Sequence, residues 1–172
     1  MLEKLILTET VIEIGKLSTI DNDEIKKHCL LHEKQITRKR GLDITDTLSE
    51  DTDIPEHEEV DKVLSLIKKE LNNQHNKNYY VDEFWAHIHH HVNVNDLINS
   101  PVLSGVYYVT APKNCGVITF QYPVNQYLDK TYWIKPEPGL FILFPSSLPH
   151  YVTRNNNEEK RISISFNFKI NK

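Results

Sequence analysis

Two segments near the end of the sequence are the most informative: Pro138-Gly-Leu-Phe-Ile-Leu-Phe-Pro-Ser-Ser-Leu-Pro-His150 and Arg161-Ile-Ser-Ile-Ser-Phe-Asn-Phe168. The first is an apolar run that ends in a proline-punctuated turn, which is typical of a buried strand and its exit. In the second, the even-numbered residues are isoleucine and phenylalanine, whereas the odd-numbered residues are arginine, serine and asparagine. Because side chains alternate along a strand, one face is apolar and the other is unusually polar, as if it lined a small wet cavity.

The whole second half of the chain, from Tyr79 onward, is predicted to form short strands. It is rich in β-branched and aromatic residues, and turn sequences recur at intervals of about ten residues. The predicted strands are residues 79–91, 102–110, 117–122, 132–134, 140–144 and 161–169. Several short strands at this spacing favour a β-sandwich or a jelly roll.

The first half is predicted to support this β core. Residues 2–17 have a strand-like pattern, residues 24–35 form a predicted helix, and residues 36–55 are expected to be a long surface loop. A second helix has apolar residues at helical spacing and acidic residues in its first turn. Its apolar residues are Val60, Val63, Leu64, Ile67 and Leu71. We therefore expect a mainly β, α+β fold in one domain, residues 1–172, with the helices of residues 1–78 packed on a core formed by residues 79–172.

Length and composition exclude several classes of protein. The chain has 172 residues, enough for one domain with a hydrophobic core. Its 20 lysines and arginines against 24 acidic residues give a net charge of −4, which argues against bulk nucleic-acid binding. The two cysteines, Cys29 and Cys115, exclude a disulfide scaffold and a four-cysteine zinc site. No apolar run is long enough for a membrane span and no signal peptide is evident, so a soluble cytoplasmic protein is expected.

The nine histidines are the compositional oddity, and four of them lie within Trp85-Ala-His-Ile-His-His-His-Val92. On a strand, His87, His89 and His91 would share one face. Two imidazoles at positions i and i+2 can bind one metal ion, and His150 is the candidate for a further ligand. The alternative is a group of exposed histidines without a metal. The other histidines are assigned no role beyond solvent exposure, and we expect none for His87.

Arg161 is the second candidate binding residue. Its planar guanidinium is suited to a bidentate contact with a carboxylate. The alternative is a surface ion pair with Glu158 or Glu159.

Together with Ser104-Gly-Val-Tyr-Tyr-Val109, the two quoted segments resemble the 2-oxoglutarate/Fe(II)-dependent dioxygenases, in particular the prolyl-hydroxylase-like small oxygenases of marine bacteria and phages. The resemblance covers about residues 80–170. It implies a double-stranded β-helix, a cupin-like jelly roll, that uses Fe(II), 2-oxoglutarate and O₂. His150 resembles the distal iron ligand, and Arg161 resembles the residue that binds the far carboxylate of 2-oxoglutarate. Tyr108, Tyr107 or Ser163 would supply a hydroxyl to the same carboxylate.

The sequence departs from the family pattern at the remaining iron ligands. The usual His-x-Asp or His-x-Glu pair does not occur between Tyr79 and Ser104. Three alternatives follow. His89, His91 and His150 form a three-histidine site; or His91, Asp96 and His150 rebuild the ordinary triad; or the site is degenerate and inactive.

The expected function is an oxygenase that decarboxylates 2-oxoglutarate to succinate and hydroxylates a C–H bond of a small-molecule or peptide substrate. Loops at residues 94–101 and 124–131 are expected to line its mouth, where Tyr127, Tyr132 and Trp133 are aromatic candidates. The alternatives are a non-catalytic jelly roll that binds a ligand or a structural metal, and an assembly protein. The substrate and the oligomeric state are left open, with a homodimer among the alternatives.

Overall fold

The computed structural model describes residues 10–32, 50–52, 54–88, 92–94, 102–125 and 128–171. Within these residues the chain forms two helices and ten strands. The helices are α1 (Asn22–His32) and α2 (Glu58–His75). The strands are β1 (Glu13–Lys16), β2 (Glu50–Thr52), β3 (Tyr79–Ile88), β4 (Val92–Val94), β5 (Leu103–Thr110), β6 (Ile118–Asn125), β7 (Leu128–Ile134), β8 (Leu140–Pro145), β9 (His150–Val152) and β10 (Ile162–Ile170).

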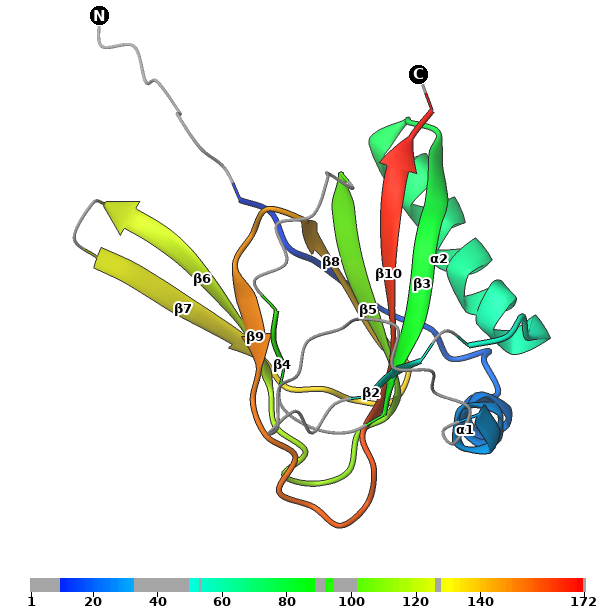
Figure 1. Cartoon of the computed structure of the whole chain (residues 1–172). Coiled ribbons are helices and arrows are strands. Elements are labelled where there is room, and N and C mark those ends of the chain that lie inside the picture. The colour runs from blue at the N-terminus through cyan, green and yellow to red at the C-terminus, as the bar shows by residue number, and fades with distance from the viewer. Residues whose placement is uncertain are drawn as a thin grey trace, which may run out of the picture.

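The strands form two antiparallel sheets. The larger has six strands in the order β1-β8-β5-β10-β3-β2, and the smaller has four in the order β4-β9-β6-β7. Both helices lie on the outer side of the six-stranded sheet, and the four-stranded sheet lies on its other side (Figure 1). The expected mainly β jelly roll with helical support is confirmed.

Two hydrophobic cores occupy the two faces of the six-stranded sheet. The outer core joins the apolar stripe of α2 to the even-numbered residues of β10, and all five predicted stripe residues are buried. The inner core lies between the sheets and contains Val106, Tyr108, Phe120, Ile142 and Phe144. The odd-numbered face of β10 therefore points into the jelly roll, as its sequence pattern predicts.

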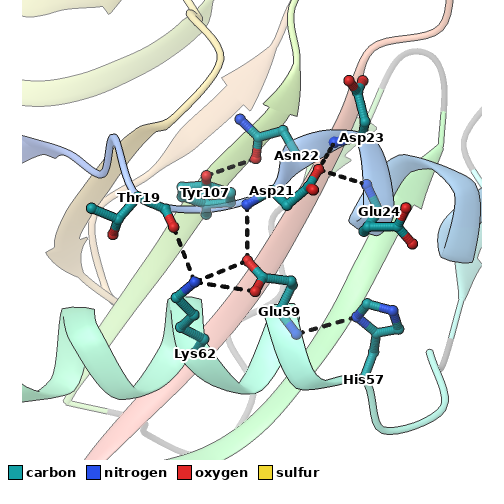
Figure 2. Close-up of polar contacts among 9 residues, drawn as sticks. All are labelled: Thr19, Asp21, Asn22, Asp23, Glu24, His57, Glu59, Lys62 and Tyr107. Atoms are coloured by element: carbon teal, nitrogen blue, oxygen red, sulfur yellow. Dashed lines mark hydrogen bonds and ion pairs between the residues drawn. The ribbon is translucent and has the colours of Figure 1, made fainter.

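A polar link ties the two helices to the large sheet (Figure 2). The backbone N–H of Asp21 donates to Glu59 on α2 at 2.8 Å, and Lys62 donates to the same carboxylate at 3.1 Å. Asp21 also caps α1, because its side chain accepts from two backbone N–H groups of the first turn. From β5, the Tyr107 hydroxyl donates to Asn22 Oδ1 at 2.7 Å. Tyr107 thus anchors α1 to the outer face of the sheet.

Several predicted boundaries are corrected by the structure. The polar segment 36–55 contains strand β2, which pairs with β3. The predicted strand 79–91 is observed as β3 up to Ile88, and residues 89–91 lie outside the described residues. The next strand, β4, begins at Val92 and belongs to the other sheet. Residues 124–131, expected to be a loop, contain the end of β6 and the start of β7, because these strands form a longer hairpin than their sequences indicate. His150 begins β9, a strand that is absent from the predicted set.

Three histidines that the sequence assigned only to solvent exposure have structural contacts. His57 caps α2 by accepting from the backbone N–H of Glu59, and His28 contacts the carbonyl of Pro55. His75 bonds Glu13 at 2.7 Å and the Tyr79 hydroxyl at 3.0 Å. The contacts of His28 and His75 hold the helices against other segments of the chain, whereas that of His57 stabilises the start of its own helix. No helix in the described part of the chain is long and apolar enough to cross a membrane.

Candidate active site

The inner face of the six-stranded sheet carries a row of polar side chains across three strands. In the register of β10, Ser163 lies opposite His87 of β3 on one side and Tyr108 of β5 on the other. Ser163 is buried, as is Arg161, which immediately precedes β10. Because these positions alternate with residues of the outer core, their side chains share the interior face. The sequence-predicted residues Arg161, Ser163 and Tyr108 are therefore brought together.

Arg161 is buried, with only 6% of its surface exposed. Its Nη1 donates to the carbonyl of Cys115 and, at 3.2 Å, to the carbonyl of Thr153. Among the described residues no carboxylate lies within ion-pair distance of this guanidinium, so the alternative of an ion pair with Glu158 or Glu159 is not observed. Burial lowers the pKa of Arg161 from its ordinary value. A buried cation without a counterion is costly, which indicates a site for an anion.

Gly116 allows the two carbonyls that hold Arg161 to lie together. It has a positive φ of 87°, and a Cβ there would lie 2.3 Å from the carbonyl oxygen of Thr153. Two hydrogen bonds join the same segments: Val117 N–H donates to Thr153 Oγ1 at 2.8 Å, and Thr153 N–H donates to the Val117 carbonyl at 2.9 Å. Only glycine tolerates this close backbone approach without strain.

The two neighbouring tyrosines of β5 lie on opposite faces. Tyr108 is 1% exposed in the inner core, and its hydroxyl has no hydrogen-bond partner among the described residues. Burial raises the pKa of Tyr108, and the nearby Arg161 acts in the opposite direction, so the two groups are electrostatic neighbours. Tyr107 lies in the outer core and bonds Asn22 (Figure 2). Of the two tyrosines offered by the sequence, only Tyr108 lies beside Arg161.

His150 faces the interior from the smaller sheet. Its ring lies 4.6 Å from Phe144 and 6.1 Å from Phe120, measured between ring centroids. Its Nδ1 lies 2.9 Å from the carbonyl of Leu148. Since a carbonyl only accepts, Nδ1 carries the proton and Nε2 keeps a lone pair. Burial lowers the pKa of His150, which favours the neutral ring. A neutral imidazole whose Nδ1–H is held by a backbone carbonyl is the usual form of a metal-binding histidine.

His87 is a site residue that sequence reasoning missed. It shares the interior row with Ser163 and Tyr108, and its charge would lower the pKa of His150, which places the two histidines in one electrostatic environment. The indole N–H of Trp85 donates to His87 Nε2 at 2.9 Å. Alternation along the strand could have placed His87 on one face of the sheet. Only the pairing of β3 with β10 shows that it lies opposite Ser163.

The other predicted ligands, His89, His91 and Asp96, lie outside the described residues, as does Tyr127. Within the described part of the chain no group of three histidine, cysteine or acidic side chains is arranged to hold a metal ion. Tyr132 and Trp133 lie on β7 and are exposed by 54% and 62%.

Comparison with known families identifies the family of this chain. Residues 76–167 match the sequence model of the family described as "Putative 2OG-Fe(II) oxygenase". The chain belongs to this family. A search of curated proteins found no match. Membership means that this oxygenase uses Fe(II), 2-oxoglutarate and O₂, and the alternative of a non-catalytic jelly roll is not favoured.

Solved structures similar to this oxygenase share its fold. The non-heme alpha-ketoglutarate-dependent carbocyclase SnoK of nogalamycin biosynthesis has a TM-score of 0.72 at 11% identity, covering 95% of this chain and 80% of that chain. The collagen prolyl hydroxylase of Paramecium bursaria Chlorella virus-1 has a TM-score of 0.62 at 19% identity, covering 94% and 96%. A prolyl hydroxylase from Trichoplax adhaerens, in complex with a peptide of hypoxia inducible factor, has a TM-score of 0.63 at 18% identity, covering 91% and 82%.

The residues of the oxygenase interior fit the groups that the family requires. 2-Oxoglutarate carries a carboxylate at each end, and the pair formed by Arg161 and Tyr108 offers a buried cation and a buried hydroxyl that has no partner among the described residues. Together these can donate several charge-assisted hydrogen bonds to one carboxylate. His150 offers a neutral ring nitrogen, which suits Fe(II).

Proposed function

We propose that this oxygenase binds 2-oxoglutarate between its two sheets, with the far carboxylate on Arg161, Tyr108 and Ser163. The observation that carries this proposal is the pairing of a buried guanidinium, without a carboxylate partner among the described residues, with a buried hydroxyl that has no partner there either. A carboxylate would satisfy both groups at once, and water could supply hydrogen bonds but no charge.

We further propose that His150 supplies one ligand to Fe(II). The remaining protein ligands would come from residues 89–96, either His89 with His91 or His91 with Asp96. His87 would line the pocket beside them. In this arrangement the Leu148 carbonyl holds the His150 ring with Nε2 unprotonated, and the aromatic rings of Phe120 and Phe144 limit its movement.

The reaction would be the hydroxylation of a C–H bond. Bound iron and 2-oxoglutarate supply the oxidising chemistry, in which O₂ provides one oxygen atom to the substrate and one to succinate as CO₂ is released. The protein's part is to orient the co-substrate through Arg161 and Tyr108 and to exclude water with the apolar residues of the inner core. A small molecule or a peptide is the proposed substrate class, since the Trichoplax relative was solved with a peptide. One domain over residues 1–172 and a cytoplasmic location remain predictions from the sequence.

The test is an anaerobic titration of the protein with Fe(II) and 2-oxoglutarate. Bidentate binding of the co-substrate should give a weak visible charge-transfer band. In Arg161→Ala the 2-oxoglutarate affinity should fall at least about tenfold, because a charge-assisted hydrogen bond contributes about 1.5–3 kcal/mol. Unchanged affinity in a folded Arg161→Ala variant would show that the carboxylate binds elsewhere.

Variants of the segment 89–96 separate the two ligand sets. His89→Ala should abolish metal binding if the site has three histidines, and Asp96→Ala should do so if a carboxylate completes the triad. If neither change, nor His91→Ala, alters Fe(II) affinity, the ligands do not come from this segment. The absence of the band and of succinate with a broad panel of substrates would contradict the enzymatic proposal itself.

A further inference from the structure

A second polar row crosses the interior face of the large sheet. It lies at Asn167 of β10, two residues beyond Ser165 on the side away from Arg161. Asn167 of β10 is buried, with 7% of its surface exposed, and lies opposite Ser104 of β5 and Glu83 of β3. Asn167 Nδ2 donates to Glu83 Oε1 at 2.6 Å, and Ser104 Oγ lies 2.8 Å from Asn167 Oδ1. Ser104 Oγ also lies 3.0 Å from Ser146 Oγ, beyond the end of β8. The four side chains form a continuous hydrogen-bonded chain.

The direction of this chain follows from the chemistry of its ends. The Glu83 carboxylate only accepts, so the Asn167 amide must turn its N–H₂ toward it and its oxygen toward Ser104. The Ser104 hydroxyl has one proton, and the amide oxygen of Asn167 requires it. Ser146 must therefore donate to Ser104. Each hydrogen bond of the chain is therefore donated in the direction of Glu83, and no member can rotate without breaking a bond to its neighbour.

The Ser146 end of the chain lies in the turn that holds His150. Residues 145–148 form this turn, closed by a hydrogen bond of 2.9 Å from the Leu148 N–H to the Pro145 carbonyl. The carbonyl of Leu148 in turn holds Nδ1 of His150 at 2.9 Å. The backbone of Leu148 therefore connects the chain to the histidine ring. Sequence alternation put Asn167 on the polar face of β10, but co-substrate binding by Arg161 and Ser163 does not use it.

We propose that Asn167 is a positioning residue for His150, acting through Ser104 and Ser146. The chain joins the turn of residues 145–148 to the large sheet, and so sets where the Leu148 carbonyl meets the histidine ring. The importance of this position for the metal rests on the proposed role of His150 as an iron ligand. Residues that orient a metal-binding histidine typically affect metal affinity by about 10–100-fold, and Asn167, which acts at a greater distance, should lie near the lower limit.

The first experiment uses the metal-free protein and measures the ¹⁵N chemical shifts of the His150 ring. The wild-type ring should show a single tautomer, with the proton on Nδ1. Asn167→Ala and Ser146→Ala should each give a mixture of tautomers, whereas Ser146→Thr, which keeps the hydroxyl, should restore the single form. Asn155→Ala is the matched control, since Asn155 is also buried, with 3% of its surface exposed, and also makes two side-chain hydrogen bonds, but in the loop before Arg161. It should leave the His150 signals unchanged.

The second experiment titrates the same variants with Co(II) alone. Asn167→Ala and Ser146→Ala should bind about tenfold more weakly than the wild type, with recovery in Ser146→Thr. Unchanged tautomers and unchanged Co(II) affinity in folded Ser146→Ala would overturn the proposal, and this variant remains informative if Asn167→Ala does not fold. His150→Ala separates the two proposals: if it leaves Co(II) affinity unchanged, the ligand role of His150 fails, while the tautomer measurement still decides whether the chain positions the ring.

Discussion

The buried hydroxyl of Tyr108 predicts that removing it changes protein stability and 2-oxoglutarate affinity in opposite directions. Tyr108 is 1% exposed, and its hydroxyl finds no acceptor in the described part of the chain. Leaving a buried polar group unsatisfied costs about 1–3 kcal/mol. Tyr108→Phe removes only the hydroxyl, so it should raise the unfolding free energy of the ligand-free protein by about 1 kcal/mol. For a chain of this size that corresponds to a Tm about 2–4 °C higher.

The same substitution should weaken 2-oxoglutarate binding. Because burial raises the pKa of Tyr108, its hydroxyl stays protonated and can donate to a carboxylate. A hydrogen bond to a charged group contributes about 1.5–3 kcal/mol, so the affinity should fall about 10–150-fold. Calorimetric titration with 2-oxoglutarate in the presence of Mn(II) measures this loss, and thermal unfolding without ligand measures the gain in stability.

The neighbouring tyrosine provides a matched control. Tyr107→Phe removes a hydroxyl that donates to Asn22 at 2.7 Å on the other face of the same strand. It should lower the unfolding free energy by about 1 kcal/mol and leave 2-oxoglutarate affinity unchanged. The reasoning is refuted if Tyr108→Phe destabilises the ligand-free protein and binds 2-oxoglutarate as tightly as the wild type.

Three further predictions concern the rest of the structure. His150→Ala should reduce Co(II) affinity by at least about tenfold, and a titration that matches the wild type would exclude His150 as a ligand. Gly116→Ala should destabilise the protein by about 1–3 kcal/mol in urea unfolding and should also weaken 2-oxoglutarate binding. The reason is that the new Cβ would lie 2.3 Å from the Thr153 carbonyl oxygen, which holds Arg161. Wild-type stability together with wild-type affinity would contradict this account. The pKa of Glu59 is lowered chiefly by the hydrogen bond from the Asp21 N–H and then by Lys62. The ionised Glu59 carboxylate therefore stabilises the fold above its ordinary pKa of 4.5, and this stabilisation is lost as the pH falls through the lower pKa of the folded state. Glu59→Gln should therefore show a weaker loss of stability at acid pH, and an unchanged pH profile of unfolding would argue against it.

Local sequence patterns were sufficient for much of the fold. The helical stripe of α2 predicts which of its side chains are buried, and the alternation of β10 predicts which of its faces is apolar, because each periodicity is a property of one element. Turn sequences separate the predicted strands, and two glycines at such positions, Gly116 and Gly139, have positive φ. Strand β2 was missed because its polar residues, Glu50–Thr52, resemble a loop, and its pairing with β3 is a long-range contact.

The sequence also predicts part of the candidate site, and the tertiary structure is needed for the rest. The sequence by itself determined that Arg161 and Ser163 share a polar strand face and that His150 follows a buried strand, since these are relations between near neighbours. It could not choose between Tyr107 and Tyr108, because both faces of central strand β5 are buried and alternation does not say which face meets the helices. Only the tertiary structure placed Tyr108 beside Arg161, His87 opposite Ser163, and Asn167 in a chain that reaches Ser146. These relations depend on the register between strands, which is decided by how the two sheets and the helices pack together.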